Sequence, residues 1–249
     1  MKNLWIFLGF LSLLSPACTY IDALTEEGEE VRKEIEIGPF ERIVLDTSVR
    51  LVLTNDSLDG AIVEGPDFVL SRLNIFQKEE VLHVETDGFF GFRKAQMPQL
   101  TLNADGLQQV RSNFPVEISN TDTLEIENLR VVVSGRGSFT ECDLTLRGGN
   151  MNISAYGSNV GDHRLSGKVE KLVVVSEGLT SVDASELVAR VVNYRQSSVN
   201  PGFVHATEKL TVNMLSSGNL YYRGDCDVQF KEGDPLYKVE LGELLEMTD

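Results

Sequence analysis

The feature of this sequence that most restricts its fold is an internal repeat of about twenty residues in the second half of the chain. Apolar residues recur at Val131, Met151, Leu172, Val192 and Val212, and two residues further on at Val133, Ile153, Val174, Tyr194 and Met214. Four residues after the second set come Gly137, Gly157, Gly178, Ser198 and Gly218. The spacing is 20, 21, 20 and 20 residues in all three columns, so the repeat keeps its phase.

Each repeat predicts a short strand followed by a bend. Two apolar residues separated by one position face the same side of a strand, and glycine fits a bend that a side chain would obstruct. Stacking such units in parallel buries a continuous apolar column. We therefore predict an all-β fold, a parallel β-solenoid (β-helix) in which one turn, or rung, takes about twenty residues. Antiparallel hairpins are the alternative, because two strands and two turns have a similar length.

A region of short strands precedes the repeat. From Phe40 the chain alternates apolar and polar residues through Ile43–Leu45 and Val49–Leu53, as a half-buried strand does. Further short apolar runs at 61–64, 73–77 and 81–85 are separated by turn residues. We therefore expect one folded domain over residues 35–230.

The N-terminus has the pattern of a bacterial export signal. Met1-Lys2-Asn3 provides a positive start, and the apolar stretch Leu4–Leu14 is too short to cross a membrane as a helix. The stretch ends in Ser15-Pro16-Ala17-Cys18, which is similar to the lipobox of bacterial lipoproteins, where lipid is attached to the cysteine and the chain is cut before it. We predict a signal peptide over 1–17 and lipidation of Cys18. An ordinary cleaved signal and an uncleaved anchor are the alternatives.

Acidic segments flank the predicted domain. Residues 18–34 are rich in acid and lack an apolar pattern, which is typical of a solvated tether. Residues 231–249 are expected to form an acidic tail that partly caps the last rung. The formal net charge of −16 makes nucleic acid an unexpected partner. Attachment to the membrane should therefore come from the lipid on Cys18 and not from a basic surface.

Patterns for catalysis and metal binding are absent from the sequence. His83, His163 and His205 lie far apart in none of the zinc-binding spacings, and we expect each at the surface or rim. Neither a Gly-x-Ser-x-Gly nucleophile elbow nor a phosphate loop occurs. We therefore predict no catalytic residue, no cofactor and no metal site.

A carbohydrate-cleaving enzyme is the catalytic alternative, because parallel β-helices often carry such activities. The candidate residues are the carboxylates Asp143, Asp162 and Asp183 with Arg136 or Arg164 nearby, and the segment Gly161-Asp162-His163-Arg164 is the first place to look. The aromatic run 88–92 is expected to cover one end of the solenoid, with a partner-binding loop as the alternative.

Two cysteines besides Cys18 provide a test of the repeat. In the predicted register Cys142 corresponds to Arg223, so Cys226 lies about four rungs away, roughly 19 Å at the usual strand spacing of about 4.8 Å. Cα atoms of a disulfide lie within roughly 7 Å. We therefore predict two free thiols, although an exported chain can form disulfides.

Several short motifs share their order and spacing with one bacterial family. They are Phe40-Glu41-Arg42-Ile43, Val49-Arg50-Leu51-Val52-Leu53, Leu82-His83-Val84, Gly137-Ser138, Gly157-Ser158, Ser216-Ser217-Gly218 and Leu220-Tyr221-Tyr222-Arg223-Gly224. Over residues 37–230 the chain resembles the DUF2807 family, described as auto-transporter adhesins with a head GIN domain. The resemblance implies a GIN-like β-solenoid on the cell envelope, often on a lipoprotein.

Together these observations predict a non-enzymatic, exported lipoprotein of the outer membrane. Its β-solenoid would serve adhesion, scaffolding or contact with a glycan or surface protein. The lipid on Cys18 would attach the protein to the membrane. The alternatives are a carbohydrate-active enzyme and a purely structural periplasmic domain. Binding by an adhesin should tolerate the loss of one carboxylate, whereas catalysis should not.

Overall fold

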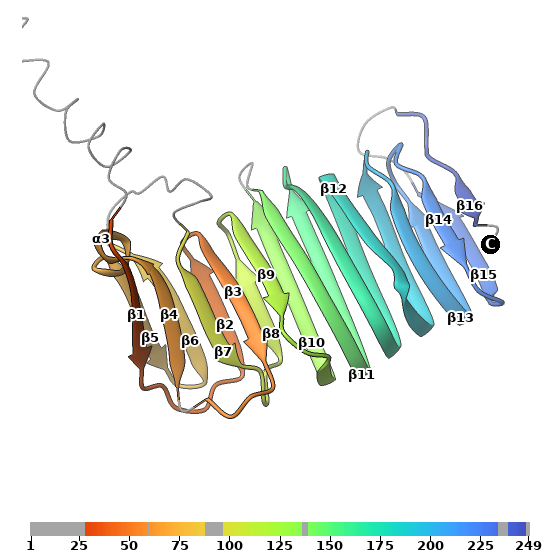
Figure 1. The fold of residues 1–249 in the computed structure, drawn as a ribbon. Helices are drawn as coiled ribbons and strands as arrows, with labels where there is room; N and C mark the ends of the chain where they lie inside the picture. Colours follow the sequence, from red (N-terminus) through yellow and green to blue (C-terminus); the bar gives the residue numbers. More distant parts are fainter. Residues whose placement is uncertain (1–27, 59, 88–96, 136–138, 234–238, 248–249) are drawn as a thin grey trace, which may run out of the picture.

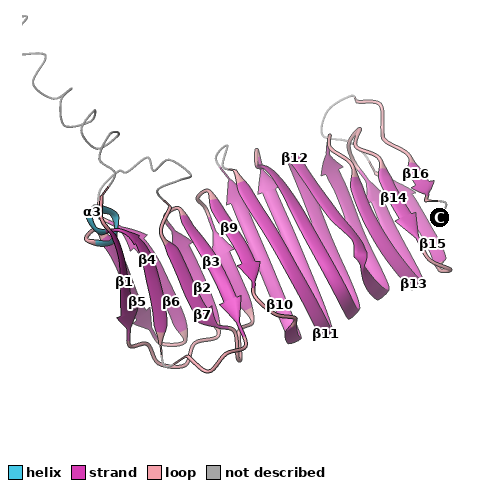
Figure 2. Cartoon of the chain, viewed as in Figure 1, coloured by secondary structure: helices cyan, strands magenta, loops and turns pink. Residues whose placement is uncertain are grey.

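The computed structural model describes residues 28–58, 60–87, 97–135, 139–233 and 239–247. Strands dominate these residues and stack into an elongated body, with β1 near one end and β16 at the other (Figure 1). Helix α3 (Asp67–Leu70) is the only helix in the described ranges (Figure 2). The strands are β1 (Glu30–Ile35), β2 (Arg42–Asp46), β3 (Val49–Thr54), β4 (Ala61–Pro66), β5 (Leu73–Lys78), β6 (Val81–Thr86), β7 (Gln99–Asn103), β8 (Gln109–Ser112), β9 (Val116–Asn120), β10 (Leu124–Gly135), β11 (Thr140–Gly157), β12 (Val160–Ser198), β13 (Gly202–Met214), β14 (Leu220–Arg223), β15 (Asp227–Glu232) and β16 (Leu244–Glu246).

The strands form one 16-stranded sheet that folds into two faces. Face A contains β1, β4, β7, β3 and β9, in that order, and then the first part of β11. Face B contains β5, β6, β2, β8 and β10, and then the later part of β11. β12 and β13 continue both faces, since the first part of β13 pairs with β14 and its later part with β15. Successive rungs are parallel, so the predicted parallel β-solenoid is confirmed.

The stacking register differs from the predicted columns at two places. Met151 pairs with Leu129 and not with Val131. Near the other end, Val192 pairs with Leu210 and not with Val212. In both places the displacement is two residues, which keeps the same set of side chains facing inward. The apolar pattern predicts the buried face correctly, but it cannot distinguish these two registers.

The glycine column marks bends that stack closely on one another. A Cβ atom on Gly178 would lie 2.6 Å from the carbonyl oxygen of Gly157, and one on Gly218 would lie 2.6 Å from that of Ser198. Gly178 also has a φ of +71°, a conformation that residues with side chains rarely adopt. Glycine therefore allows the bends of successive rungs to approach, as the repeat predicts; Gly137 lies outside the described residues.

The region of short strands before the repeat belongs to the same solenoid. Although β2 and β3 precede β6–β9 in the chain, they stack between the rung formed by β6 and β7 and the rung formed by β8 and β9. The strands β1, β4 and β5 close this end with antiparallel pairing. Parallel stacking therefore begins well before the repeat is visible in the sequence.

Two segments that we predicted to lie outside the domain contribute strands. The prediction of a tether over 18–34 is wrong for its last residues, because β1 begins at Glu30 and pairs with β4 along its length. As an edge strand with an exposed, charged pattern, β1 lacks the apolar alternation that identifies buried strands. In the tail 231–249, β16 pairs in parallel with β14 and so extends face A by one strand. The predicted signal peptide and Cys18 lie outside the described residues.

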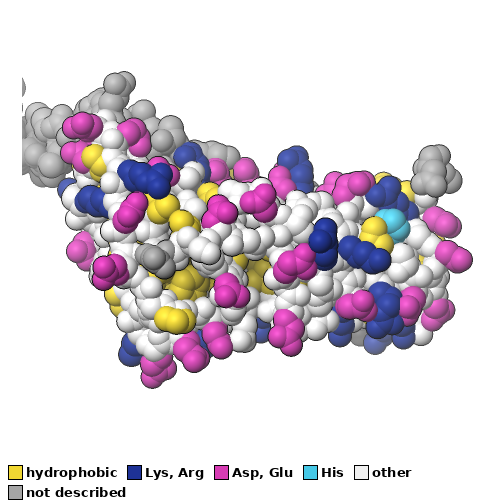
Figure 3. All heavy atoms as spheres, turned by 60° about the horizontal axis from the view of Figure 1, so that its bottom comes forward, with side chains coloured by type: hydrophobic (Ala, Val, Ile, Leu, Met, Phe, Trp, Pro, Cys, Tyr) yellow, Lys and Arg dark blue, Asp and Glu magenta, His cyan; other side chains and the backbone are white. Residues whose placement is uncertain are grey.

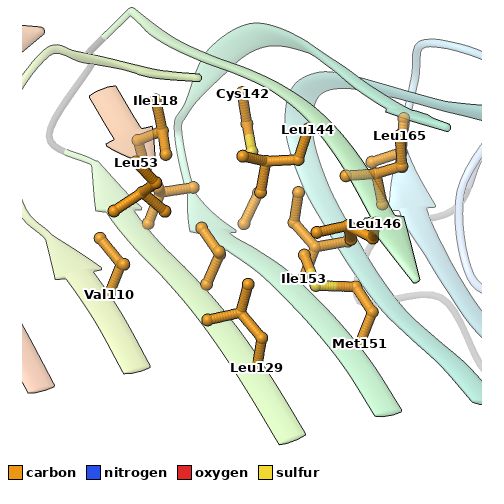
Figure 4. Packing of buried hydrophobic residues seen from close by; sticks show 14 of the residues in the cluster. Leu53, Val110, Ile118, Leu129, Cys142, Leu144, Leu146, Met151, Ile153 and Leu165 are labelled. Atoms are coloured by element: carbon orange, nitrogen blue, oxygen red, sulfur yellow. The ribbon is translucent and has the colours of Figure 1, made fainter. Parts of the chain in front are cut away.

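The hydrophobic core lies between the two faces. Leu144 and Leu165, at the start of their rungs, point toward Met151 and Ile153 from the later parts of the rungs (Figure 4). All four side chains are 0–2% exposed. Burying a side chain of this size stabilises a fold by about 1.5–3 kcal/mol, so these columns hold successive rungs together.

The core also contains two titratable side chains. Cys142 and His163 lie opposite one another on adjacent rungs, and each is 1% exposed. The prediction that His163 lies at the surface is wrong, because it alternates with the exposed Asp162 and Arg164 and therefore faces inward. Neither ring nitrogen of His163 has a hydrogen-bond partner among the described residues. Burial lowers its pKa to about 4, while burial and then the charge of Asp143 raise the pKa of Cys142 to about 12.

Acidification is therefore expected to destabilise this protein through His163. The pKa of His163 in the folded protein lies below its usual value of 6.5. Below about pH 6.5 the unfolded chain therefore binds a proton that the folded protein does not, so the free energy of unfolding decreases as the pH falls toward 4. Between pH 7.5 and pH 5 this effect should lower the free energy of unfolding by about 2 kcal/mol. Urea denaturation of the wild type and His163→Leu at both pH values measures it. The variant should lack this loss and His83→Gln should retain it; equal pH dependence in wild type and His163→Leu would contradict the assignment.

The two cysteines should remain unpaired and differ in reactivity. Both are free thiols, Cys142 buried and Cys226 partly exposed. Burial, together with the charges of nearby acids, raises the pKa of Cys226, so its alkylation should be slow but measurable. Mass spectrometry after alkylation should find Cys226 modified in the folded protein and Cys142 only after unfolding. An intramolecular disulfide between them would be incompatible with this register.

Candidate binding surface

The structure brings Asp143, Asp162 and Arg164 onto one face but turns His163 away from them. Asp143 and Arg164 lie opposite one another at outward positions of face A. Asp162 is exposed on the same face, whereas the neighbouring His163 points into the core. Asp162 and His163 therefore cannot act together on one bound ligand.

The remaining candidates do not complete a reactive group. Asp183 accepts hydrogen bonds from the backbone N–H and the hydroxyl of Ser185, at 3.0 and 2.6 Å. Arg136 and the aromatic run 88–92 lie outside the described residues. Within the part of the chain that is described, no three or more His, Cys, Asp or Glu residues are arranged to hold a metal ion. In the same ranges no helix is long and apolar enough to span a membrane.

Several arginines on face A, and at the bends leading from it to face B, are paired with carboxylates, whereas Arg164 forms no ion pair among the described residues. The pairs are Arg32–Glu64 (3.2 Å), Arg50–Glu117 (2.9 Å), Arg147–Glu125 (3.2 Å), Arg190–Glu170 (2.8 Å), Arg190–Glu208 (2.6 Å) and Arg223–Glu186 (2.7 Å). Acidic and basic side chains are correspondingly interspersed over the surface seen in Figure 3. Exposed pairs contribute little stability, but they leave these arginines locally neutralised.

Face B has the opposite character. Its outward basic residues form no ion pair among the described residues; they are Arg42, Lys78, Arg111, Arg130, Lys171, Arg195, Lys209 and Lys231. The acids at outward positions of this face are fewer, and each accepts a hydrogen bond from an amide; they are Asp46, Glu85, Glu177 and Asp227. Face B therefore carries an excess of unneutralised positive charge on a chain whose net charge is −16.

Three consecutive rungs of face B, together with Gln108 directly before β8, form a groove of about 370 Å³. Its polar lining consists of Gln108, Asn128, Arg130, Asn150, Asn152 and Lys171, and its apolar lining of Leu129, Met151 and Val173. No acidic side chain contributes to it. The groove is thus shaped by β10, β11 and β12 where they stack in register.

Hydrogen bonds within the groove fix the orientation of its amides. The side-chain nitrogen of Asn150 donates to the side-chain oxygen of Asn128 at 2.6 Å. The side-chain oxygen of Asn152 accepts from the hydroxyl of Ser154 at 2.9 Å. The Asn128 and Asn152 nitrogens are then left as donors beside the Arg130 guanidinium, so the groove offers mainly donors to a ligand.

The groove could not be predicted from the apolar repeat. Asn128 and Asn150 are 22 residues apart, whereas the predicted columns at that point were 20 apart, so the two amides did not align. A polar residue directly before the inward-facing Leu129 and Met151 was the available signal. It becomes visible only once the true register is known.

Solved structures of similar fold come from Bacteroides and Parabacteroides species. A putative adhesin from Bacteroides fragilis has a TM-score of 0.71 at 18% identity, covering 88% of this chain and 97% of its own. A putative adhesin from Parabacteroides distasonis has a TM-score of 0.61 at 17% identity, covering 89% and 98%. A putative lipid binding protein from the same species has a TM-score of 0.60 at 15% identity, covering 88% and 94%. At these identities the likeness is one of fold; no curated protein matches the chain.

The family is shown by the sequence over most of the domain. The DUF2807 family model, described as "Putative auto-transporter adhesin, head GIN domain", matches residues 39–226. The match covers the rungs from β2 to β14. It therefore confirms the resemblance based on the short motifs. Together with the fold, it identifies residues 39–226 as an adhesin-like domain built as a β-solenoid. The chain belongs to the DUF2807 family of head GIN domain proteins.

Proposed function

We propose that this chain is a non-enzymatic, lipid-anchored protein of the cell envelope that uses the outer surface of its β-solenoid for adhesion. A lipid on Cys18 would hold it in the outer membrane, and the segment Ser15-Pro16-Ala17-Cys18 supports this anchor. Membership of an adhesin-like family supports export. The acidic chain itself would be repelled by anionic headgroups, so the lipid has to provide attachment.

The groove on face B is the observation that carries the adhesive function. Its polar lining binds through hydrogen bonds and positive charge, and it contains no carboxylate or imidazole of the kind that general acid–base catalysis uses. It lies on three rungs of a regular surface that continues with unpaired basic residues on either side. Such a surface suits the binding of an extended partner along successive rungs.

Binding without turnover is the direct test of this function. Cells that display the full chain should bind specific spots on an array of glycans and extracellular-matrix proteins, and a product scan of any bound polysaccharide should find no cleavage. Asp162→Asn should leave the binding unchanged. Cleavage that disappears in Asp162→Asn would instead support a carbohydrate-active enzyme, and resistance of the chain to protease on intact cells would support a structural periplasmic role.

Replacing Cys18 with serine should release the protein from the membrane. The lipid is the expected anchor, and a diacylated terminus provides the two acyl chains that stable attachment requires. Metabolic labelling with palmitate and membrane fractionation should show a labelled, membrane-bound wild type and an unlabelled, soluble Cys18→Ser. Cys226→Ser is the matched control and should stay labelled. Labelling that persists in Cys18→Ser would contradict the proposed anchor.

A further inference from the structure

We propose that the groove on face B binds an acidic polysaccharide whose charges are carboxylates, that is, a polyuronate. This inference rests on the proposed adhesive function and names the partner of the surface that carries it. The groove is defined by its six polar lining residues, Gln108, Asn128, Arg130, Asn150, Asn152 and Lys171.

The lining of the groove matches such a ligand chemically. An arginine guanidinium binds a carboxylate through two parallel hydrogen bonds, which Arg130 can provide. The amide nitrogens of Asn128 and Asn152 are left as donors by the hydrogen bonds to Asn150 and Ser154, and sugar hydroxyls and ring oxygens are acceptors for them. Of the apolar residues in the lining, Leu129 and Met151 face the core, whereas Val173 faces outward and can contact the C–H groups of a sugar ring.

The charges of the groove are available for a ligand. On face A, Arg32 and Arg50 are paired with glutamates at 3.2 and 2.9 Å, so a ligand at either arginine would have to displace a partner. Arg130 and Lys171 are exposed and form no ion pair among the described residues. A chain with 38 acidic residues could neutralise them easily, yet the groove contains none. The positive charge of the groove is therefore left for a partner.

The spacing of these charges fits a polymer. Arg130 in β10 pairs with Asn152 in β11, which in turn pairs with Val173 in β12. Lys171 lies in β12 two residues before Val173, so Arg130 and Lys171 are two strands apart. Two strand spacings and an offset of two residues along the strand place their Cα atoms about 12 Å apart, so the two charges would contact carboxylates on different sugars of one polymer. The donors of the groove lie in and between these strands, where the hydroxyl groups and ring oxygens of the sugars between two bound carboxylates would lie. Toward the N-terminal end, Arg111 and Arg42 continue the line of basic residues across the neighbouring strands.

The net charge of the chain selects among polyanions. A formal charge of −16 repels any polyanion at long range, and most strongly one as densely charged as duplex DNA, with a charge per 1.7 Å of axis. A polyuronate has fewer charges per length and many hydroxyl groups for the amides of the groove. The hydrogen-bond donors of the groove can therefore outweigh the repulsion between the acidic chain and a polyuronate. They cannot outweigh the stronger repulsion of nucleic acid.

Binding of polygalacturonate to the full mature chain in detergent tests the proposal. Isothermal titration should detect binding by the wild type and a loss of about tenfold or more in affinity for Arg130→Gln/Lys171→Gln, since charged hydrogen bonds are removed. Arg164→Gln/Lys168→Gln changes the charge equally on face A, at exposed positions, and should bind within about twofold of wild type. Circular dichroism and thermal unfolding show whether each variant is folded.

Three results would overturn the assignment: unchanged affinity in folded Arg130→Gln/Lys171→Gln, no binding of polygalacturonate by the wild type, or equal binding of duplex DNA or neutral dextran. Adhesion of displaying cells to the array separates the two proposals. If wild-type cells adhere and cells with the groove variant adhere equally, adhesion stands and only the polyuronate groove is wrong. If wild-type cells adhere to nothing, the adhesive function itself is wrong.

Discussion

The hydrogen-bonded register between parallel rungs is the constraint on which the rest of this structure depends. Once two rungs are aligned, every side chain acquires fixed neighbours about 4.8 Å away on the same face. That register places Cys142 opposite His163 inside the core and brings the hydroxyl oxygens of Thr145 and Ser166 within 2.9 Å outside it. It also lines up Asn128 with Asn150 in the groove. Core, surface pairing and candidate site are thus consequences of one alignment.

The two faces use the same register to opposite effect. On face A the register places Arg50 beside Glu117, and the two form an ion pair at 2.9 Å. On face B it aligns Arg42 and Arg130 on either side of Gln109, so that charges of the same sign recur without a carboxylate between them. A stable core does not require this arrangement, because like charges repel one another even across one intervening strand. The cost is understandable if face B has an anionic partner.

Sequence reasoning predicted the fold and the family, because inward residues repeat with a period of two and the glycine bends recur with each rung. It could not predict the register, since a displacement of two residues leaves the buried face of Met151 and Val192 unchanged. The burial of His163 was missed because histidine is intermediate in its preference for burial and is not one of the apolar residues that mark an inward column, although the alternation around it places it inward. The groove could not be predicted for the same reason, as its amides meet only in the true register. Lipidation of Cys18 stays a prediction.

Cross-linking across two rungs tests the register most directly. In a Cys142→Ala/Cys226→Ala background, Thr145→Cys/Ser166→Cys places thiols at paired outward positions, where the Cα separation suits a disulfide. Thr145→Cys/Arg164→Cys, displaced by two residues along the same face, is the matched control. Under mild oxidation the parallel register predicts a disulfide in the first protein and little in the second, measured by mass spectrometry. A disulfide in the control alone, or in neither protein, would contradict the register and the solenoid built on it.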